Sequence, residues 1–287
     1  MSGQLRALKN RIRSVESTQK ITRAMEMVAT AKLKRYQDSL SRSLPYERTL
    51  TGILEKLSRT GRPLHHPLFE SRPEERTALL VFTSDTGLCG AYNQDLVATA
   101  KSFIQERSKK PLLIGIGKHG IHALTRAGHD WHAAFKDTKP SQGEAVIQEV
   151  TARTQDLFSG KTIDALYAVH SRFETKTVAR PHVEKILPFT FLPNARVGAG
   201  TDDYIFEPGP ENLFVRLVPL VLESRIRVIS LESLVAEQMA RMNAMHQATE
   251  NASELIETLV LLRNKVRQAA ITKELIEIVS GSKALKN

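Results

Sequence analysis

The stretch VISLESLVAEQMARMNAMHQAT, residues 228–249, decides the fold of this chain. Alternating steps of three and four residues along it meet mostly apolar side chains, which is the heptad pattern of a coiled coil. The same steps continue outward on both sides. The resulting seam consists of Leu217, Val221, Ser224, Val228, Leu231, Val235, Gln238, Met242, Met245, Thr249, Ala252, Ile256, Leu259, Arg263, Val266 and Ala270.

The length of this pattern predicts one extended helix. No glycine lies between Pro210 and Gly281, and Pro219 is the only proline inside this interval. We therefore expect a coiled-coil helix over 211–283, within a C-terminal segment of residues 209–287. At a rise of about 1.5 Å per residue it would be about 110 Å long. Pro219 should kink its first turns.

A helix with so long a seam needs a partner along its length, and the N-terminal 60 residues supply one. No glycine or proline lies between Gly3 and Pro45, and good helix formers continue to Leu57. This pattern predicts an N-terminal coiled-coil helix within residues 1–60, ended by the glycines and prolines of 60–73. Its apolar stripe consists of Leu5, Leu8, Ile12, Val15, Ile21, Met25 and Val28.

The middle of the chain has a different pattern, that of alternating strands and helices. We expect strands at 76–84, 111–116, 163–171 and 178–189, with a short strand near Trp131, and helices at 94–107, 119–127 and 144–158. Together they predict a Rossmann-like α/β domain over residues 74–192. This domain is inserted between the two long helices, and residues 193–210 form the linker back to the second one.

Composition limits the class of protein. The chain is 41% hydrophobic and 25% charged, enough for a packed core, and no apolar run is long enough to span a bilayer. No secretion signal is recognisable, which favours a bacterial cytoplasmic setting. The single cysteine, Cys89, excludes an internal disulfide and a cysteine-based zinc cluster.

The net charge of +10 is concentrated at the N-terminus, where nine Lys and Arg residues within the first 36 are opposed by only Glu16 and Glu26. A solvated helix face accounts for such a pattern, and an acidic partner also does. Binding of a basic coiled coil to a nucleic-acid backbone is an alternative. The scarcity of aromatic residues in this arm, which has only Tyr36, disfavours recognition of single strands.

Three further motifs suggest chemistry. Gly115, Gly117 and Gly120 form G-x-G-x-x-G after an apolar run, as in a dinucleotide-binding enzyme. However, the following helix ends at Gly128, and no acidic residue stands at the position that would hold a ribose. We therefore expect a structural turn between a strand and a helix, and no cofactor.

The other two motifs are also expected to be structural. His119, His122, His129 and His132 have metal-like spacing without a completing carboxylate pattern, so solvated histidines are favoured over a metal site. The loop SDTGLCGAYN, residues 84–93, contains Cys89, which could be a nucleophile; a structural loop with a buried thiol is favoured.

Three blocks of the sequence resemble the gamma subunit of F-type ATP synthases. They are RIRSVESTQKITRAMEMVATAKLKR at 11–35, the SDTGLCG turn at 84–90, and EQMARMNAMHQATENA at 237–252 followed by NKVRQAAITKELIEIVSGSKAL at 264–285. They occur in the order and at the distances of that family. One departure is Arg263, which stands where an aromatic residue is common and puts the local helix packing in doubt. A regulatory dithiol like that of the chloroplast form is excluded by the single cysteine.

The resemblance implies a non-catalytic rotor. In the family the two long helices form an antiparallel coiled coil inside a ring of alternating alpha and beta subunits, and the α/β domain lies near the epsilon subunit and the membrane c ring. Rotation couples proton or sodium translocation to ATP synthesis or hydrolysis at the beta subunits. The resemblance implies no cofactor, no metal, no nucleic acid and no membrane span of its own. It also implies a peripheral location on the cytoplasmic face of the bacterial plasma membrane.

The resemblance also implies which residues contact the alpha/beta ring, and none of them is catalytic. They are Lys20, Met25, Arg241, Arg267, Gln268, Thr272 and Glu274. The guanidinium of Arg267 suits bidentate pairing with a carboxylate.

Overall fold

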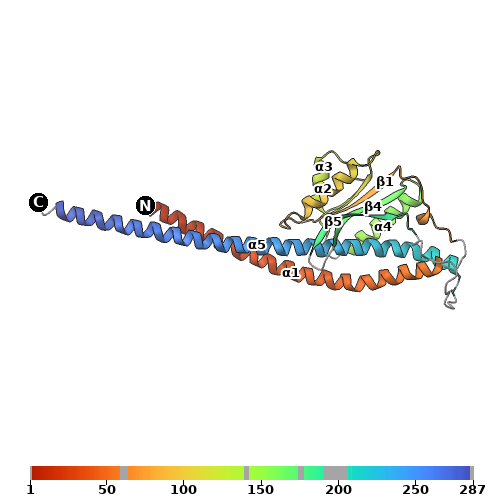
Figure 1. The fold of residues 1–287 in the computed structure, drawn as a ribbon, viewed down its shortest axis with the longest axis horizontal. Helices are drawn as coiled ribbons and strands as arrows, with labels where there is room; N and C mark the ends of the chain where they lie inside the picture. The colour runs from red at the N-terminus through yellow and green to blue at the C-terminus, as the bar shows by residue number, and fades with distance from the viewer. Residues whose placement is uncertain are drawn as a thin grey trace. The chain divides into compact units, whose positions relative to one another are not determined.

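The computed structural model describes residues 2–58, 64–138, 142–173, 178–190, 206–207 and 209–284. It divides into two compact units, which Figure 1 draws in one view. The coiled-coil unit combines Met1–Thr30 with Arg241–Asn287, and the sheet unit comprises Ala31–Ala240. Helices α1 (Ser2–Ser58) and α5 (Pro210–Ala284) each contribute to both units.

The predicted fold class is confirmed, since a mixed α/β sheet unit lies between two long terminal helices in the sequence. Pro219 lies inside α5, which continues through it, while the kink we expect there stays a prediction. The expected linker over 193–210 lies largely outside the described residues. None of the helices, over the residues that were described, is both long and apolar enough to cross a membrane.

The sheet has five strands in the order β3-β2-β1-β4-β5. Four strands are parallel to one another: β1 (Thr77–Phe82), β2 (Leu112–Ile116), β3 (Ala133–Phe135) and β4 (Ala165–Phe173). The edge strand β5 (Ala179–Leu187) is antiparallel to β4. The crossover helices are α2 (Tyr92–Gln105), α3 (Lys118–Arg126) and α4 (Gly143–Ser159), and a 3₁₀ turn, η1, covers Pro67–Phe69. All these elements fall at predicted segments except η1, which the sequence did not indicate.

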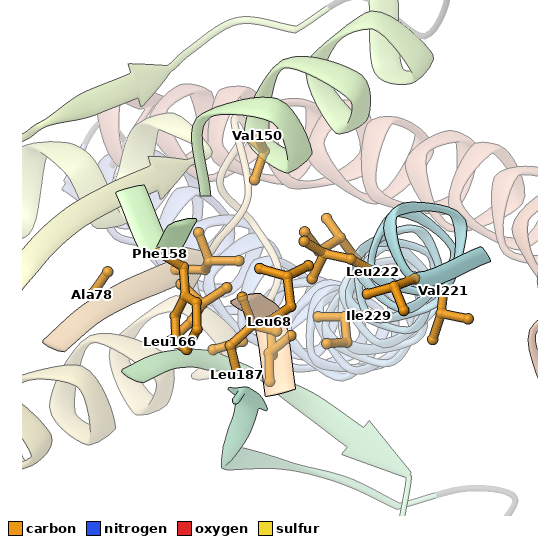
Figure 2. Close-up of a cluster of buried hydrophobic side chains, with 14 of the residues drawn as sticks. Leu68, Ala78, Val150, Phe158, Leu166, Leu187, Val221, Leu222 and Ile229 are labelled. Carbon is orange, nitrogen blue, oxygen red and sulfur yellow. The ribbon is translucent and has the colours of Figure 1, made fainter. Parts of the chain in front are cut away.

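Helices cover both faces of this sheet, so its central strand is buried throughout. Alternate side chains of β1 enter two cores, because successive residues of a strand point to opposite faces. Leu79 and Val81 pack with α2, whereas Leu80 and Phe82 belong to a cluster that includes α4 and α5. Figure 2 shows this second cluster, in which Leu68 is drawn between Phe158 and Leu166 on one side and Leu222 and Ile229 on the other.

The second core also takes in the parts of both long helices that belong to the sheet unit. Leu50, Leu54 and Leu57 of α1 and Phe214 and Val218 of α5 are buried in it. The predicted domain limits follow chain order, whereas the compact unit joins the sheet with residues from 31 onward and up to 240. The sheet is therefore packed directly on α5 and is more than an appendage between the helices.

Candidate functional site

The glycine fingerprint is a packing device. A Cβ atom on Gly117 would lie 2.0 Å from the carbonyl oxygen of Thr83, and Gly117 has φ +98°. A Cβ on Gly120 would lie 2.6 Å from Thr83 Cγ2, and one on Gly115 the same distance from side-chain atoms of Ile121 and Trp131. Each glycine is needed for close approach within the protein, as the structural interpretation of this turn predicted.

The place where a dinucleotide would bind is already occupied by a side chain. In a dinucleotide-binding turn the pyrophosphate sits at the helix N-terminus. Here Asp85 fills that position. Its Oδ1 accepts hydrogen bonds from the backbone N–H of Lys118 (2.9 Å) and Asp137 (3.0 Å), and its Oδ2 accepts one from Thr138 (3.0 Å). The carboxylate neutralises the N-terminus of α3, which argues against the enzyme alternative.

The loop around Cys89 is structural, as expected. Ser84 and Cys89 are buried, and Asn93 holds the loop closed. Asn93 Nδ2 donates to Ser84 Oγ (2.7 Å) and to Cys89 Sγ (3.2 Å), while its Oδ1 accepts the Ser84 N–H (3.0 Å). The thiol is therefore shielded from substrates.

The four histidines of the metal-like pattern lie at the surface or near it. His119, His122 and His132 are exposed, and His129 is half-buried. In the described ranges no group of three or more His, Cys, Asp or Glu residues is arranged to hold a metal ion.

The coiled-coil unit is an antiparallel helix pair, and three polar contacts fix its register. Gln19 Nε2 donates to Ser253 Oγ (2.7 Å), Thr249 Oγ1 donates to Thr22 Oγ1 (2.8 Å), and His246 Nδ1 lies 2.9 Å from Glu26 Oε1. In each contact the two residue numbers add to 271 or 272, so the residue number on α5 falls as that on α1 rises, as in an antiparallel pair with one register. Apolar contacts surround this polar zone, and the buried ones are Ile12, Ala29, Met245, Ala252, Leu259 and Ala270.

The predicted seam of α5 is confirmed, because each of its positions is buried or half-buried. Arg263 also follows this rule: its side chain is half-buried and donates from Nη2 to Asn264 Oδ1 (3.2 Å). The guanidinium of Arg263 is thus held by a residue of its own helix.

The predicted stripe of α1 is wrong at two places. Ile21 is 58% exposed and Val28 is 55% exposed, although both were assigned to the seam. The helix instead turns Gln19 and Thr22 toward α5, where they hydrogen-bond to the hydroxyls of Ser253 and Thr249, and it buries Ala29. The two apolar side chains lie outside the seam, where the chain itself does not cover them.

Further apolar side chains are exposed along the coiled-coil unit. They are Met27 of α1 and Leu255, Leu261, Leu262, Ile271, Leu275, Ile276, Ile278 and Val279 of α5. The last five follow from the register: Ser2 lies opposite Ala270, so α1 provides no partner beyond that point. Figure 1 shows the C-terminal end of α5 extending past the N-terminal end of α1. Sequence periodicity did not reveal this surface, because it cannot separate apolar residues that form a core from apolar residues that await a partner.

The predicted ring-contact residues differ in accessibility. Lys20, Arg267, Gln268 and Thr272 are exposed, Met25 is half-buried, and Arg241 is buried, with 7% exposed. Thr272 Oγ1 donates to the backbone carbonyl oxygen of Gln268 (3.0 Å), within the same helix. Glu274 belongs to α5, but its side chain lies outside the described residues. All seven contacts stay predictions.

Comparison with known proteins identifies the family. A family model described as ATP synthase matches residues 4–285. The chain is 34% identical to the ATP synthase gamma chain of Heliobacterium modesticaldum, over 98% of this chain and 99% of that protein. It is 36% identical to that of Symbiobacterium thermophilum over the whole of both. Its fold is similar to a chain in the cryo-EM structure of the Euglena gracilis mitochondrial ATP synthase (TM-score 0.68, 18% identity, 99% of this chain and 95% of that one). With a family match over nearly its whole length and such relatives, the chain belongs to the ATP synthase gamma chain family.

Proposed function

We propose that this chain is the central rotor shaft of an F-type ATP synthase, coupling proton or sodium translocation to ATP synthesis or hydrolysis. The exposed apolar side chains of the coiled-coil unit carry the proposal. Ile21, Met27 and Val28 leave more than half of their surface in water, as do most of the apolar residues beyond Ala270. Contiguous apolar surface on a folded protein marks a site for another protein. A surrounding ring of subunits would cover it on several sides at once.

The same unit supports a turning contact. Its two helices differ in length and in side chains around their circumference, so each angle of the shaft presents a different surface to a given ring subunit. A rotor can select among conformations of its neighbours only through such differential contacts. Catalysis then takes place on the beta subunits, and this chain contributes no catalytic group.

Seven side chains would make the specific contacts with the alpha/beta ring. They are Lys20, Met25, Arg241, Arg267, Gln268, Thr272 and Glu274. The exposed members among them suit a shaft, because solvated ion pairs and hydrogen bonds are weak and screened. Contacts of this kind break and re-form at each angle without holding the shaft at one of them.

The remaining partners follow from the family. The sheet unit would contact the epsilon subunit and the membrane c ring, which places the protein peripherally on the cytoplasmic face of the bacterial plasma membrane. The high net positive charge suits acidic loops on the ring.

Reconstitution tests the proposal. The chain should co-purify with alpha and beta subunits, and the complex should pump ions when ATP is added. Ile21→Gln with Val28→Gln should lower pumping per ATP hydrolysed while leaving folding intact, because exposed positions tolerate polar residues. The matched control, Ile21→Leu with Val28→Leu, keeps the apolar surface and should pump normally. A chain that instead binds DNA with steep salt dependence and fails to join the complex would disprove the rotor assignment.

A further inference from the structure

A cluster of polar contacts surrounds α5 where the helix crosses the sheet. Four side chains or backbone groups within residues 225–233 of α5 make polar contacts with five other elements of the sheet unit. We call this cluster the polar junction. Its members are Arg225, Arg227, Glu232 and Ser233 of α5, Glu47 of α1, Tyr92 of α2, Glu144 of α4, His170 of β4 and Glu184 of β5.

One side of the polar junction is an ionic chain of half-buried side chains around the buried His170. Arg225 donates to Glu184 Oε1 from Nε (2.8 Å) and from Nη2, and its Nη1 lies 3.7 Å from Glu47 Oε1. The other carboxylate oxygen of Glu184 lies 3.3 Å from His170 Nε2. His170 is completely buried, and its Nδ1 faces Glu232 Oε2 at 3.7 Å. The chain thus starts on α5, passes through both strands and returns to α5.

The other side uses different partners. Arg227 Nη2 donates to Glu144 Oε1 (2.5 Å) and to Glu223 Oε1 (2.6 Å), and its Nη1 contacts the second oxygen of Glu144. The hydroxyl of Tyr92 donates to the backbone carbonyl oxygen of Ser233 in α5 (3.0 Å). Polar contacts therefore hold α5 from several directions around its axis.

The charged groups in this chain stabilise one another. Burial alone would raise the pKa of Glu184, but the hydrogen bond from His170 and the charge of Arg225 outweigh this effect and lower the pKa from 4.5 to about 2. Burial raises the pKa of Glu232. Such a network is costly compared with apolar packing of the same volume, so its best-attested use is to fix one geometry among several.

The surrounding apolar core does not fix that geometry by itself. Val221, Leu222, Ile226 and Ile229 hold α5 against the sheet, but the hydrophobic effect is non-directional and tolerates small rotations of a helix about its axis. Hydrogen-bonded ion pairs have narrow ranges of length and angle, and the Arg–carboxylate fork is the most directional of them.

We propose that the polar junction fixes the angular position of the sheet on α5, so that torque passes between them without slip. Its members are positioning residues, and the inference rests on the proposed rotor function. If the sheet contacts the membrane rotor and α5 continues into the shaft, rotation loads this junction directly. If the sheet rotated relative to α5, the sheet could turn while the shaft stayed in place. Ions would then cross the membrane without ATP being made.

The test removes the central ion pair of the polar junction by replacing both of its partners at once. In the assembled enzyme, Arg225→Met combined with Glu184→Leu replaces the pair by apolar side chains of similar volume. Ser108→Cys, at an exposed site of the sheet unit, carries a bead in every sample. The angular variance of the bead during the pauses between steps measures how firmly the sheet is held. ATP hydrolysis and ATP-driven ion pumping are measured on the same preparations.

A matched control separates the polar junction from ion pairs in general. Arg153→Met with Glu149→Leu removes an exposed Arg–Glu pair within α4, which lies outside the polar junction. For the junction variant we expect assembly and ATP hydrolysis to persist, while the angular variance of the bead rises at least about twofold, because the sheet loses contacts that restrict its rotation on α5. Ions pumped per ATP should fall, and the control should match the wild type.

Unchanged variance and pumping in the junction variant would overturn the inference. If that variant does not assemble, Arg225→Lys decides, because it keeps the charge and loses the fork: wild-type variance in this protein would overturn the inference, and raised variance would support it. A different failure, in which even the wild-type complex hydrolyses ATP without pumping, would refute the rotor function and is distinguishable from both.

Discussion

Replacing Gly117 by alanine tests whether the glycine turn is architectural. The structure gives two costs for Gly117→Ala. The backbone there has φ +98° and ψ 133°, a region adopted almost only by glycine, so the dihedral strain is about 1–3 kcal/mol. The added Cβ would lie 2.0 Å from the Thr83 carbonyl oxygen, and relieving that overlap costs about 1–3 kcal/mol more. The free energy of unfolding of the sheet unit should therefore fall by about 2–6 kcal/mol.

The chain offers its own probe and control for this measurement. Trp131 is the only tryptophan and lies in the sheet unit, so its fluorescence in urea reports that unit separately from the coiled-coil unit. Gly128→Ala has the same sign of φ, +83°, but its Cβ would meet nothing within 4 Å. It should cost only the strain, about 1–2 kcal/mol.

The expected difference is large enough to resolve. For Gly117→Ala we expect a urea midpoint lower by about 1–3 M, and for Gly128→Ala a shift of about a third to a half of that. Equal shifts for the two variants would refute the packing argument, because they would show that the approach of Gly117 to Thr83 carries no energy. A bound dinucleotide, visible by absorbance and lost in Gly117→Ala, would refute the architectural interpretation altogether.

Three further predictions concern the shaft and the ionic chain. Met25→Lys in the assembled complex should reduce ATP-driven pumping per ATP hydrolysed with assembly retained, because it adds a donor facing acidic loops; equal pumping would contradict the proposed contact. Truncation after Ala270 should lower the free energy of unfolding by less than about 1 kcal/mol, since the apolar residues removed are exposed, yet weaken coupling; an insoluble sheet unit would count against this. The pKa of Glu184 is about 2 against an ordinary 4.5, so its ionised form contributes about 3 kcal/mol above pH 4.5, which is lost as the pH falls toward 2. The raised pKa of Glu232 offsets part of this loss, and urea midpoints of wild type and Glu184→Gln at about pH 5 and about pH 3 should show the steeper fall for the wild type.

The sequence predicted those elements whose pattern is long or whose two faces are both buried. The strand over 76–84 was recognisable because β1 is apolar at every position after Thr77, as is typical of a central parallel strand that is buried on both faces. The seam of α5 was recognisable because its heptads persist over many turns. Bounds agreed to within a few residues, since glycine and proline mark where the elements end.

What the sequence did not predict depends on contacts between distant segments. Ile21 and Val28 were assigned to a core because an apolar residue at helical spacing gives the same signal whether its partner is in the chain or outside it. The packing of Leu54 and Leu57 on the sheet unit was equally hidden. His170 offered one usable signal: it shares a strand face with Leu166 and Ala168, both buried, so a histidine at that parity implies a buried partner.

The two kinds of surface in this chain suit opposite mechanical needs. At the polar junction, the contacts are charged, hydrogen-bonded and directional, and they surround the buried His170. Along the coiled-coil unit, the exposed groups are apolar side chains and solvated cations, whose individual attractions are weak and break readily. A rotor built the other way round would bind its ring at one angle and slip on its own base. In the proposed rotor the polar junction serves torque transmission, so exchanging the ionic chain for apolar packing should reduce coupling before it reduces stability.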